Sequence, residues 1–214
     1  MVRSQDGPSA ADFVPSSREL DDLRAAASSC RGCELYESAT QTVFGAGSPR
    51  ARVMLIGEQP GDREDVAGEP FVGPAGQLLR EILAECSITA RDCYMTNAVK
   101  HFRWQPQSRG KRRLHAKPVV RHIRACRPWL EAEIEAVNPE LVVCLGATAG
   151  QSCFGSGFRL LDVRGRVLEG PWGHPTLCTY HPSAVLRAPD TATRTEMRRT
   201  LRKDLGEVAA RLAS

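Results

Sequence analysis

The sequence predicts an α/β fold: a three-layer α/β/α sandwich around a central, mostly parallel four-stranded sheet. Three observations predict it. Four short apolar segments read as buried strands, helical patterns separate them, and a loop rich in glycine or polar residues follows each one. Strands that alternate with helices favour a parallel sheet, because the crossover helices cover its faces. The chain has 214 residues, which suits one compact domain.

The N-terminal region divides into an arm and the start of the domain. Residues 1–17 are polar and contain Pro, Ser and Gly, so we expect a flexible arm, with a single domain over residues 18–214. The apolar spacing after Ser17 predicts a short capped helix that leads to Cys30 and Cys33.

The predicted strands are Val53–Ile56, the segment around Tyr94, Leu141–Leu145 and Leu177–Tyr180. Each is a short apolar run of the kind that is buried inside a sheet. Between them, Pro74–Cys86 is the clearest helix, because its apolar residues fall on one face and a proline stands in its first turn.

The segments after these strands are the candidate site. They are Gly57–Gly61, Asn97, the stretch "GATAG" and His181 with Pro182. Ligands bind beyond the carboxyl ends of strands in open parallel sheets, so these segments can converge. Neither glycine stretch completes a phosphate-binding loop or a dinucleotide fingerprint. The alternative is that each one is simply a turn at the end of a strand.

The charge is unevenly distributed along the chain. The net charge is +4, yet residues 93–130 hold ten Lys or Arg and no Asp or Glu, which leaves −6 for the remainder. Clustered cations attract phosphates through counterion release, so this segment indicates a nucleic-acid contact. A solvated loop is the alternative.

The cysteines indicate a metal site. We find no secretory leader and no membrane-spanning run, so we expect a cytoplasmic protein whose eight cysteines are reduced. Cys30 and Cys33 form a chelate-sized pair, Cys126 offers a third thiolate, and His101 is the best fourth ligand. Spacing alone leaves zinc and an iron–sulfur cluster both open.

Five motifs carry a family resemblance. "GEQPGDREDVAGEPFVGPAG", "YMTNAVKHF", "ACRPWL", "LGATA" and "HPSAVLR" occur in this order. Together they resemble the iron–sulfur branch of the uracil-DNA glycosylase superfamily, from about Asp12 to the C-terminus. Within that branch the chain resembles the UdgX group, which shares Gln59, His101 and an inserted basic loop, here at about residues 103–118. Two residues depart from the pattern: relatives have isoleucine where Leu114 stands, and serine is common where Ala184 stands.

The resemblance implies a role for each matching residue. It implies a [4Fe-4S] cluster with a structural function, held by Cys30, Cys33, His101 and Cys126. It implies uracil binding by Gly57, Gln59, Phe71, Asn97 and His181, and DNA binding by Lys111, Arg112, Arg113, Ser183 and Arg187. The catalytic residues that it implies are His115, Glu58, His181 and Gln59, with Glu58 orienting His115 and Gln59 filling the place of a hydrolytic water.

The implied reaction is unusual. A glycosylase extrudes its target base before cleaving the glycosidic bond, and in the UdgX group the loop histidine, here His115, then captures the deoxyribose C1′ and forms a covalent protein–DNA adduct. The alternative is a conventional uracil-DNA glycosylase that releases uracil and leaves an abasic site. A non-catalytic DNA-binding module is a third possibility. We expect the partner to be uracil-containing DNA, preferably single-stranded, and the protein to be a monomer near the bacterial nucleoid with no membrane contact.

Overall fold

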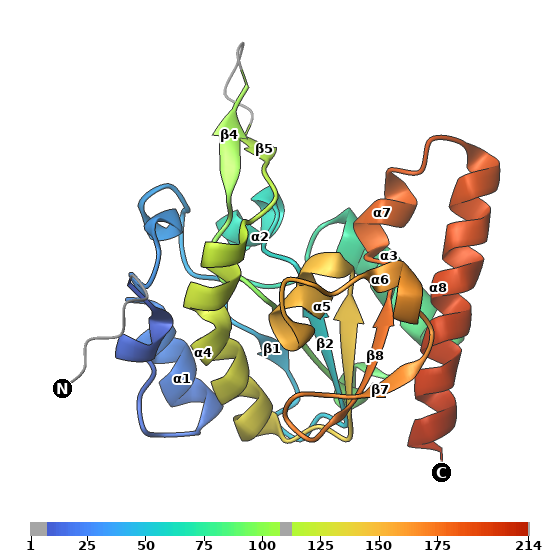
Figure 1. The fold of residues 1–214 in the computed structure, drawn as a ribbon, viewed down its shortest axis with the longest axis horizontal. Helices are drawn as coiled ribbons and strands as arrows, with labels where there is room; N and C mark the ends of the chain where they lie inside the picture. Colours follow the sequence, from blue (N-terminus) through green and yellow to red (C-terminus); the bar gives the residue numbers. More distant parts are fainter. Residues whose placement is uncertain (1–7, 108–112, 214) are drawn as a thin grey trace.

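The central sheet has six strands, in the order β1-β3-β2-β6-β8-β7. This computed structural model describes residues 8–107 and 113–213 (Figure 1). The four central strands are parallel and match the four expected ones: β3 (Cys93–Asn97), β2 (Val53–Gly57), β6 (Leu141–Leu145) and β8 (Pro175–Thr179). Two antiparallel edge strands, β1 (Ala46–Gly47) and β7 (Val167–Glu169), extend the expected four to six. With only two and three residues, they are too short to produce a sequence pattern.

Helices cover both faces of the sheet, which confirms the three-layer arrangement. Alternate residues of β2 face opposite layers, as the pleat of a strand requires. Val53 and Leu55 pack with α3 (Pro74–Glu85), α7 (Pro182–Leu186) and α8 (Thr191–Leu212). Met54 and Ile56 pack with α4 (Val120–Val137) and α5 (Ala147–Phe154). Two shorter helices, α2 (Asp62–Ala67) and α6 (Leu160–Val163), lie near the carboxyl ends of the strands (Figure 1).

A third apolar cluster joins the N-terminal segment to α4. It contains α1 (Leu20–Ala27) and the 3-10 helices Ala10–Asp12 and Glu34–Glu37. Within the expected arm, Ala10 is only 1% exposed, and Phe13 and Val14 pack against the same cluster, while Ala11, Asp12 and Ser16 are exposed. The flexibility of residues 1–17 stays a prediction.

The described parts of the basic insertion include an antiparallel pair of strands, which we call the hairpin. Strands β4 (Trp104–Pro106) and β5 (Arg113–His115) pair antiparallel, with Trp104 opposite His115. The hairpin projects beyond the carboxyl ends of the parallel strands (Figure 1). Lys111 and Arg112 lie outside the described residues.

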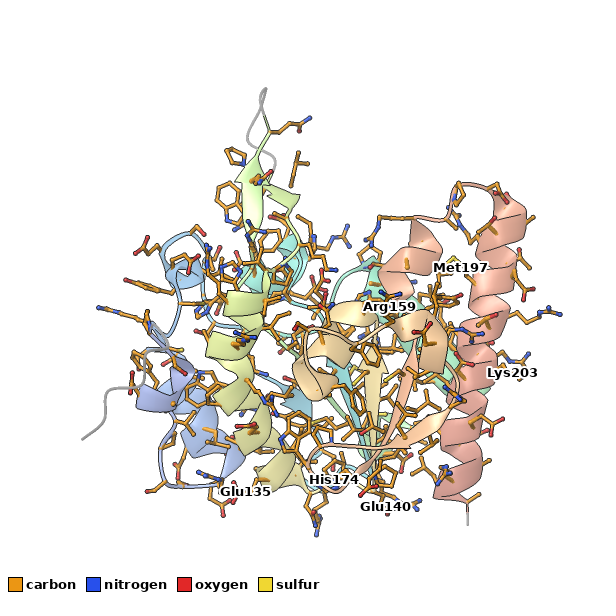
Figure 2. All side chains as sticks on the ribbon, in the orientation of Figure 1. Glu135, Glu140, Arg159, His174, Met197 and Lys203 are labelled. Atoms are coloured by element: carbon orange, nitrogen blue, oxygen red, sulfur yellow. The ribbon has the colours of Figure 1, made fainter. Side chains whose placement is uncertain are left out.

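Figure 2 shows Glu140 and His174 at the end opposite the hairpin, where the parallel strands begin.

Among the described residues, we find no helix with the length and apolarity needed to cross a membrane.

Candidate active site

A pocket of about 890 Å³ opens at the carboxyl ends of the parallel strands. It receives Glu58 after β2, Asn97 at the end of β3, Thr148 after β6 and His181 after β8. The structure therefore brings the four expected segments to one place. The expected site residues on its lining are Glu58, Gln59, Phe71, Asn97, His115, His181, Ser183 and Arg187.

His115 and Glu58 meet at the mouth of this pocket. His115 Nε2 lies 3.3 Å from Glu58 Oε1, and the His115 side chain is 46% exposed. Thr148 Oγ1 donates a hydrogen bond to the other Glu58 oxygen. Burial raises the pKa of Glu58, but the contacts with His115 and Thr148 outweigh it, so the pKa lies below its ordinary value. Glu58 is therefore an ionised acceptor that can orient the imidazole.

Phe71 and Asn97 line the pocket, and Gly57, which is not among the lining residues, packs closely against both. A Cβ atom at Gly57 would stand 2.3 Å from Asn97 Oδ1 and 2.7 Å from Phe71 Cζ, so only glycine lets these side chains approach. Phe71 has a positive φ of 58°, a conformation that costs energy outside glycine. Arg80 Nη1 donates to the Phe71 carbonyl at 2.8 Å and helps to hold it.

His181 presents a defined ring nitrogen. Its Nδ1 accepts a hydrogen bond from the Ser183 backbone N–H at 3.1 Å. Since a backbone N–H can only donate, Nδ1 carries no proton, and the proton of the neutral ring belongs on Nε2. Burial lowers the pKa of His181 to about 4, because the charged form is poorly solvated there. At neutral pH this residue is a neutral hydrogen-bond donor.

Gln59 holds the base of the hairpin. Its Nε2 donates to the carbonyl oxygens of Arg103 at 3.1 Å and Ala116 at 3.2 Å, and its Oε1 accepts from the Arg103 N–H at 3.1 Å. These bonds join the two arms of the hairpin to the loop after β2. The amide of Gln59 is thus an anchor, and its expected displacement of a water stays a prediction.

Arg113 is a second anchor. It contacts Asp62 Oδ1 at 2.6 Å and the fully buried Asp65 Oδ2 at 2.5 Å. Its guanidinium also lies over the rings of Phe102 and Trp104. Two carboxylates already compensate its charge, so in this structure Arg113 fixes β5, and its expected phosphate contact stays a prediction.

Of the expected metal ligands, the three cysteines belong to the third apolar cluster, and His101 is buried as well. Cys30, Cys33, Cys126 and His101 are each no more than 9% exposed. Burial, together with the neighbouring Cys33 and Cys30, raises the pKa of Cys126 to about 12 despite the nearby charge of Lys100. Burial lowers the pKa of His101 to about 4, which leaves a neutral imidazole. Over residues 8–107 and 113–213, no group of three or more His, Cys, Asp or Glu is arranged to hold a single metal ion.

The sequence interpretation missed several residues at this site. Thr148 lies inside "GATAG", where the glycines and the position after a strand give no sign that this hydroxyl binds Glu58. Arg63 and Lys117 line the pocket and add cations to Arg187. The segment of ten cations already contained Lys117, but Arg63 had no signal, because only the fold of α2 brings it there.

Comparison with known proteins now decides the family. A profile described as the uracil DNA glycosylase superfamily matches residues 44–206, a span that includes every pocket residue described above. This chain belongs to the uracil-DNA glycosylase superfamily.

The superfamily relatives span most of the chain. The Type-4 uracil-DNA glycosylase of Archaeoglobus fulgidus is 37% identical over 177 residues, covering 79% of this chain and 84% of its own length. That of Thermotoga maritima is 37% identical over 178 residues, covering 82% and 85%. The Type-5 uracil-DNA glycosylase of Thermus thermophilus is 30% identical over 162 residues, covering 66% and 68%.

Proposed function

We propose that this protein excises uracil from DNA by cleaving the N-glycosidic bond. One observation carries the proposal: in a chain of the uracil-DNA glycosylase superfamily, a single pocket gathers an aromatic ring, an amide and a neutral histidine. The names of the relatives agree with this activity.

The pocket suits a pyrimidine that has left the base stack. Asn97 offers a donor and an acceptor, which matches the imide edge of uracil. Phe71 supplies a flat face for stacking. As the glycosidic bond breaks, its electron pair moves onto uracil, and the Nε2–H of His181 can stabilise the negative charge through a hydrogen bond.

Cations at the rim would hold the DNA backbone. Arg187, Arg63 and Lys117 line the pocket and can contact phosphates on either side of an extruded nucleotide. Lys111 and Arg112, which the resemblance also assigns to DNA binding, lie outside the described residues. Ser183, also expected to bind DNA, hydrogen-bonds to His181 Nδ1 and so keeps the imidazole proton on Nε2. A single strand is the preferred substrate, since it has no paired partner to lose on extrusion.

We also propose an iron–sulfur cluster held by Cys30, Cys33, Cys126 and His101. Three features support this proposal: the three cysteines belong to one buried apolar cluster, Cys33 and Cys30 contribute to the raised pKa of Cys126, and the buried imidazole of His101 is neutral. When bound, the cluster would link the N-terminal segment to α4 and supply structural stability. The protein as purified should be brown and contain iron, whereas a colourless zinc protein would refute this assignment.

A further part of the proposal concerns the sugar that remains after excision. After uracil leaves, a lone pair on a ring nitrogen of His115 would form a bond to C1′, and the imidazole proton would pass to Glu58. The 3.3 Å contact between these side chains supports this proposal. So does the clamp of Gln59, which holds the hairpin beside the pocket. An alkylated imidazole is a poor leaving group, so the protein would remain attached.

Conventional turnover is the second candidate. In it, water attacks C1′ and the protein releases an abasic site. The names of the relatives are closer to this reading, because they describe uracil-DNA glycosylases and mention no adduct. Both candidates begin with the same excision.

One experiment separates the candidates. The protein is incubated with an equimolar single-stranded oligonucleotide that contains one uracil, and free uracil and denaturation-resistant protein–DNA bands are both measured. Trapping predicts one adduct per uracil released, with loss of the band in His115→Ser. Uracil release without an adduct supports turnover. No release, with equal binding of thymine and uracil, would support the non-catalytic DNA-binding module.

A further inference from the structure

A fully buried ion pair lies next to Asn97, the residue proposed to read the uracil base. Lys100 and Glu133 are both 0% exposed and form a direct contact between Nζ and Oε2. Lys100 comes three residues after Asn97, and Glu133 lies on α4. The excision chemistry described above uses neither residue.

The three donors of the ammonium group are all assigned. Lys100 Nζ donates to Glu133, to Thr96 Oγ1 at 2.7 Å and to the backbone carbonyl of Asn97 at 2.9 Å. An ammonium group has three N–H donors, so this set saturates it. Its direction is therefore fixed, and one of its bonds ends on the residue proposed to read uracil.

Glu133 is fixed with equal completeness. It accepts hydrogen bonds from Tyr94 Oη at 3.0 Å, from Thr96 Oγ1 at 2.9 Å and from the Gly45 N–H at 3.0 Å. The carboxylate thus joins β3, the segment before β1 and α4. Lys100 transmits this rigid support to the end of β3, where Asn97 enters the pocket.

Stability alone does not account for a charged pair at this position. Desolvating two charges is costly, and well-packed apolar residues of similar volume are often as stable. A charged pair does fix directions, because each donor and acceptor must meet its partner. We infer that Lys100, braced by Glu133, is a positioning residue that holds Asn97 in the orientation that reads uracil. This inference rests on the proposed function.

The first test observes Asn97 without any reaction. The chain contains only two asparagines, Asn97 and Asn138. Protein labelled with ¹⁵N-asparagine therefore gives two side-chain NH2 groups, each seen as a pair of signals, and Asn138 at the end of α4 serves as an internal reference. We expect Lys100→Met to shift or broaden the Asn97 amide and leave Asn138 unchanged. Unaltered Asn97 signals would overturn the inference.

Two further variants serve as controls for this test. Lys100→Met with Glu133→Gln removes both buried charges, so it avoids an unpaired carboxylate if the single variant folds poorly. Arg52→Met breaks the Arg52–Glu140 ion pair at the opposite end of the sheet and should leave both signals in place. A shift of the Asn97 amide in Arg52→Met equal to that in Lys100→Met would contradict a specific role.

The second test is a double-mutant cycle on uracil release. Single-turnover rates are compared for the unmodified protein, Lys100→Met, Asn97→Ala and the combination. Misplacement of a recognition group by about 1 Å can slow a reaction about a hundredfold, so we expect Lys100→Met to lose about ten- to a hundredfold. In the Asn97→Ala background the same change should alter the rate by no more than about twofold. Equal losses in both backgrounds would show a general structural effect and refute the inference.

The two tests separate the inference from the proposed function. If the unmodified protein releases no uracil, the proposed function fails, yet the amide spectra still decide whether Lys100 holds Asn97.

Discussion

The buried carboxylate of Asp65 offers the sharpest test of how the hairpin is held. It accepts hydrogen bonds from the Thr40 N–H at 3.0 Å, from Thr40 Oγ1 at 2.6 Å and from Arg113 Nη1 at 2.5 Å. Asp65→Ala removes these acceptors and leaves Arg113 with a mostly buried guanidinium. Breaking a buried pair costs about 3–5 kcal/mol, and Arg113 keeps Asp62, so we expect about 3 kcal/mol.

Thermal unfolding measures this cost directly. For a domain of this size, each kcal/mol corresponds to roughly 2–4 °C, so the Tm should fall by about 6–12 °C. Asp62→Ala is the matched control, since it removes the other partner of the same arginine. The Asp62 side chain is 57% exposed, so an ion pair there contributes at most about 1 kcal/mol. Equal losses in the two variants, or a loss below about 1 kcal/mol in Asp65→Ala, would refute the reasoning.

Three further predictions concern the site. Gln59→Ala should loosen the hairpin and slow adduct formation by His115 more than uracil release, which parallel assays of both products would measure; equal slowing would contradict the anchor. His181 has a pKa near 4 in the fold, so the unfolded state binds more protons below pH 6.5, and stability should fall by about 1 kcal/mol from pH 6.5 to 5.5. Urea unfolding at both pH values should show a smaller fall in His181→Asn, and an unchanged fall would exclude this residue. Cys126→Ser should lose the iron and the brown colour, measured by metal analysis and absorbance, and full iron content would remove Cys126 from the ligand set.

Part of the site could be predicted because it depends only on residue type and on position relative to the buried strands. The buried strands are continuous apolar runs, and the end of each parallel strand marks where a ligand can bind. Glu58, Asn97 and His181 follow such strands directly, so their meeting in one pocket was predictable from sequence. The edge strands and the packing of Ala10 were not, because they depend on neighbours far along the chain.

The sequence by itself determined which residues follow the ends of the parallel strands, where the cations gather and which cysteines stand at chelate spacing. Only the tertiary structure decided what each group touches. It turned Arg113 into an anchor for β5, committed the amide of Gln59 to the hairpin and placed Lys100 behind Asn97. The physical reason is that hydrogen bonds and ion pairs act over about 3 Å, whereas the partners of Arg113 and Gln59 lie 44 or more positions away in the chain, and Glu133 lies 33 positions from Lys100.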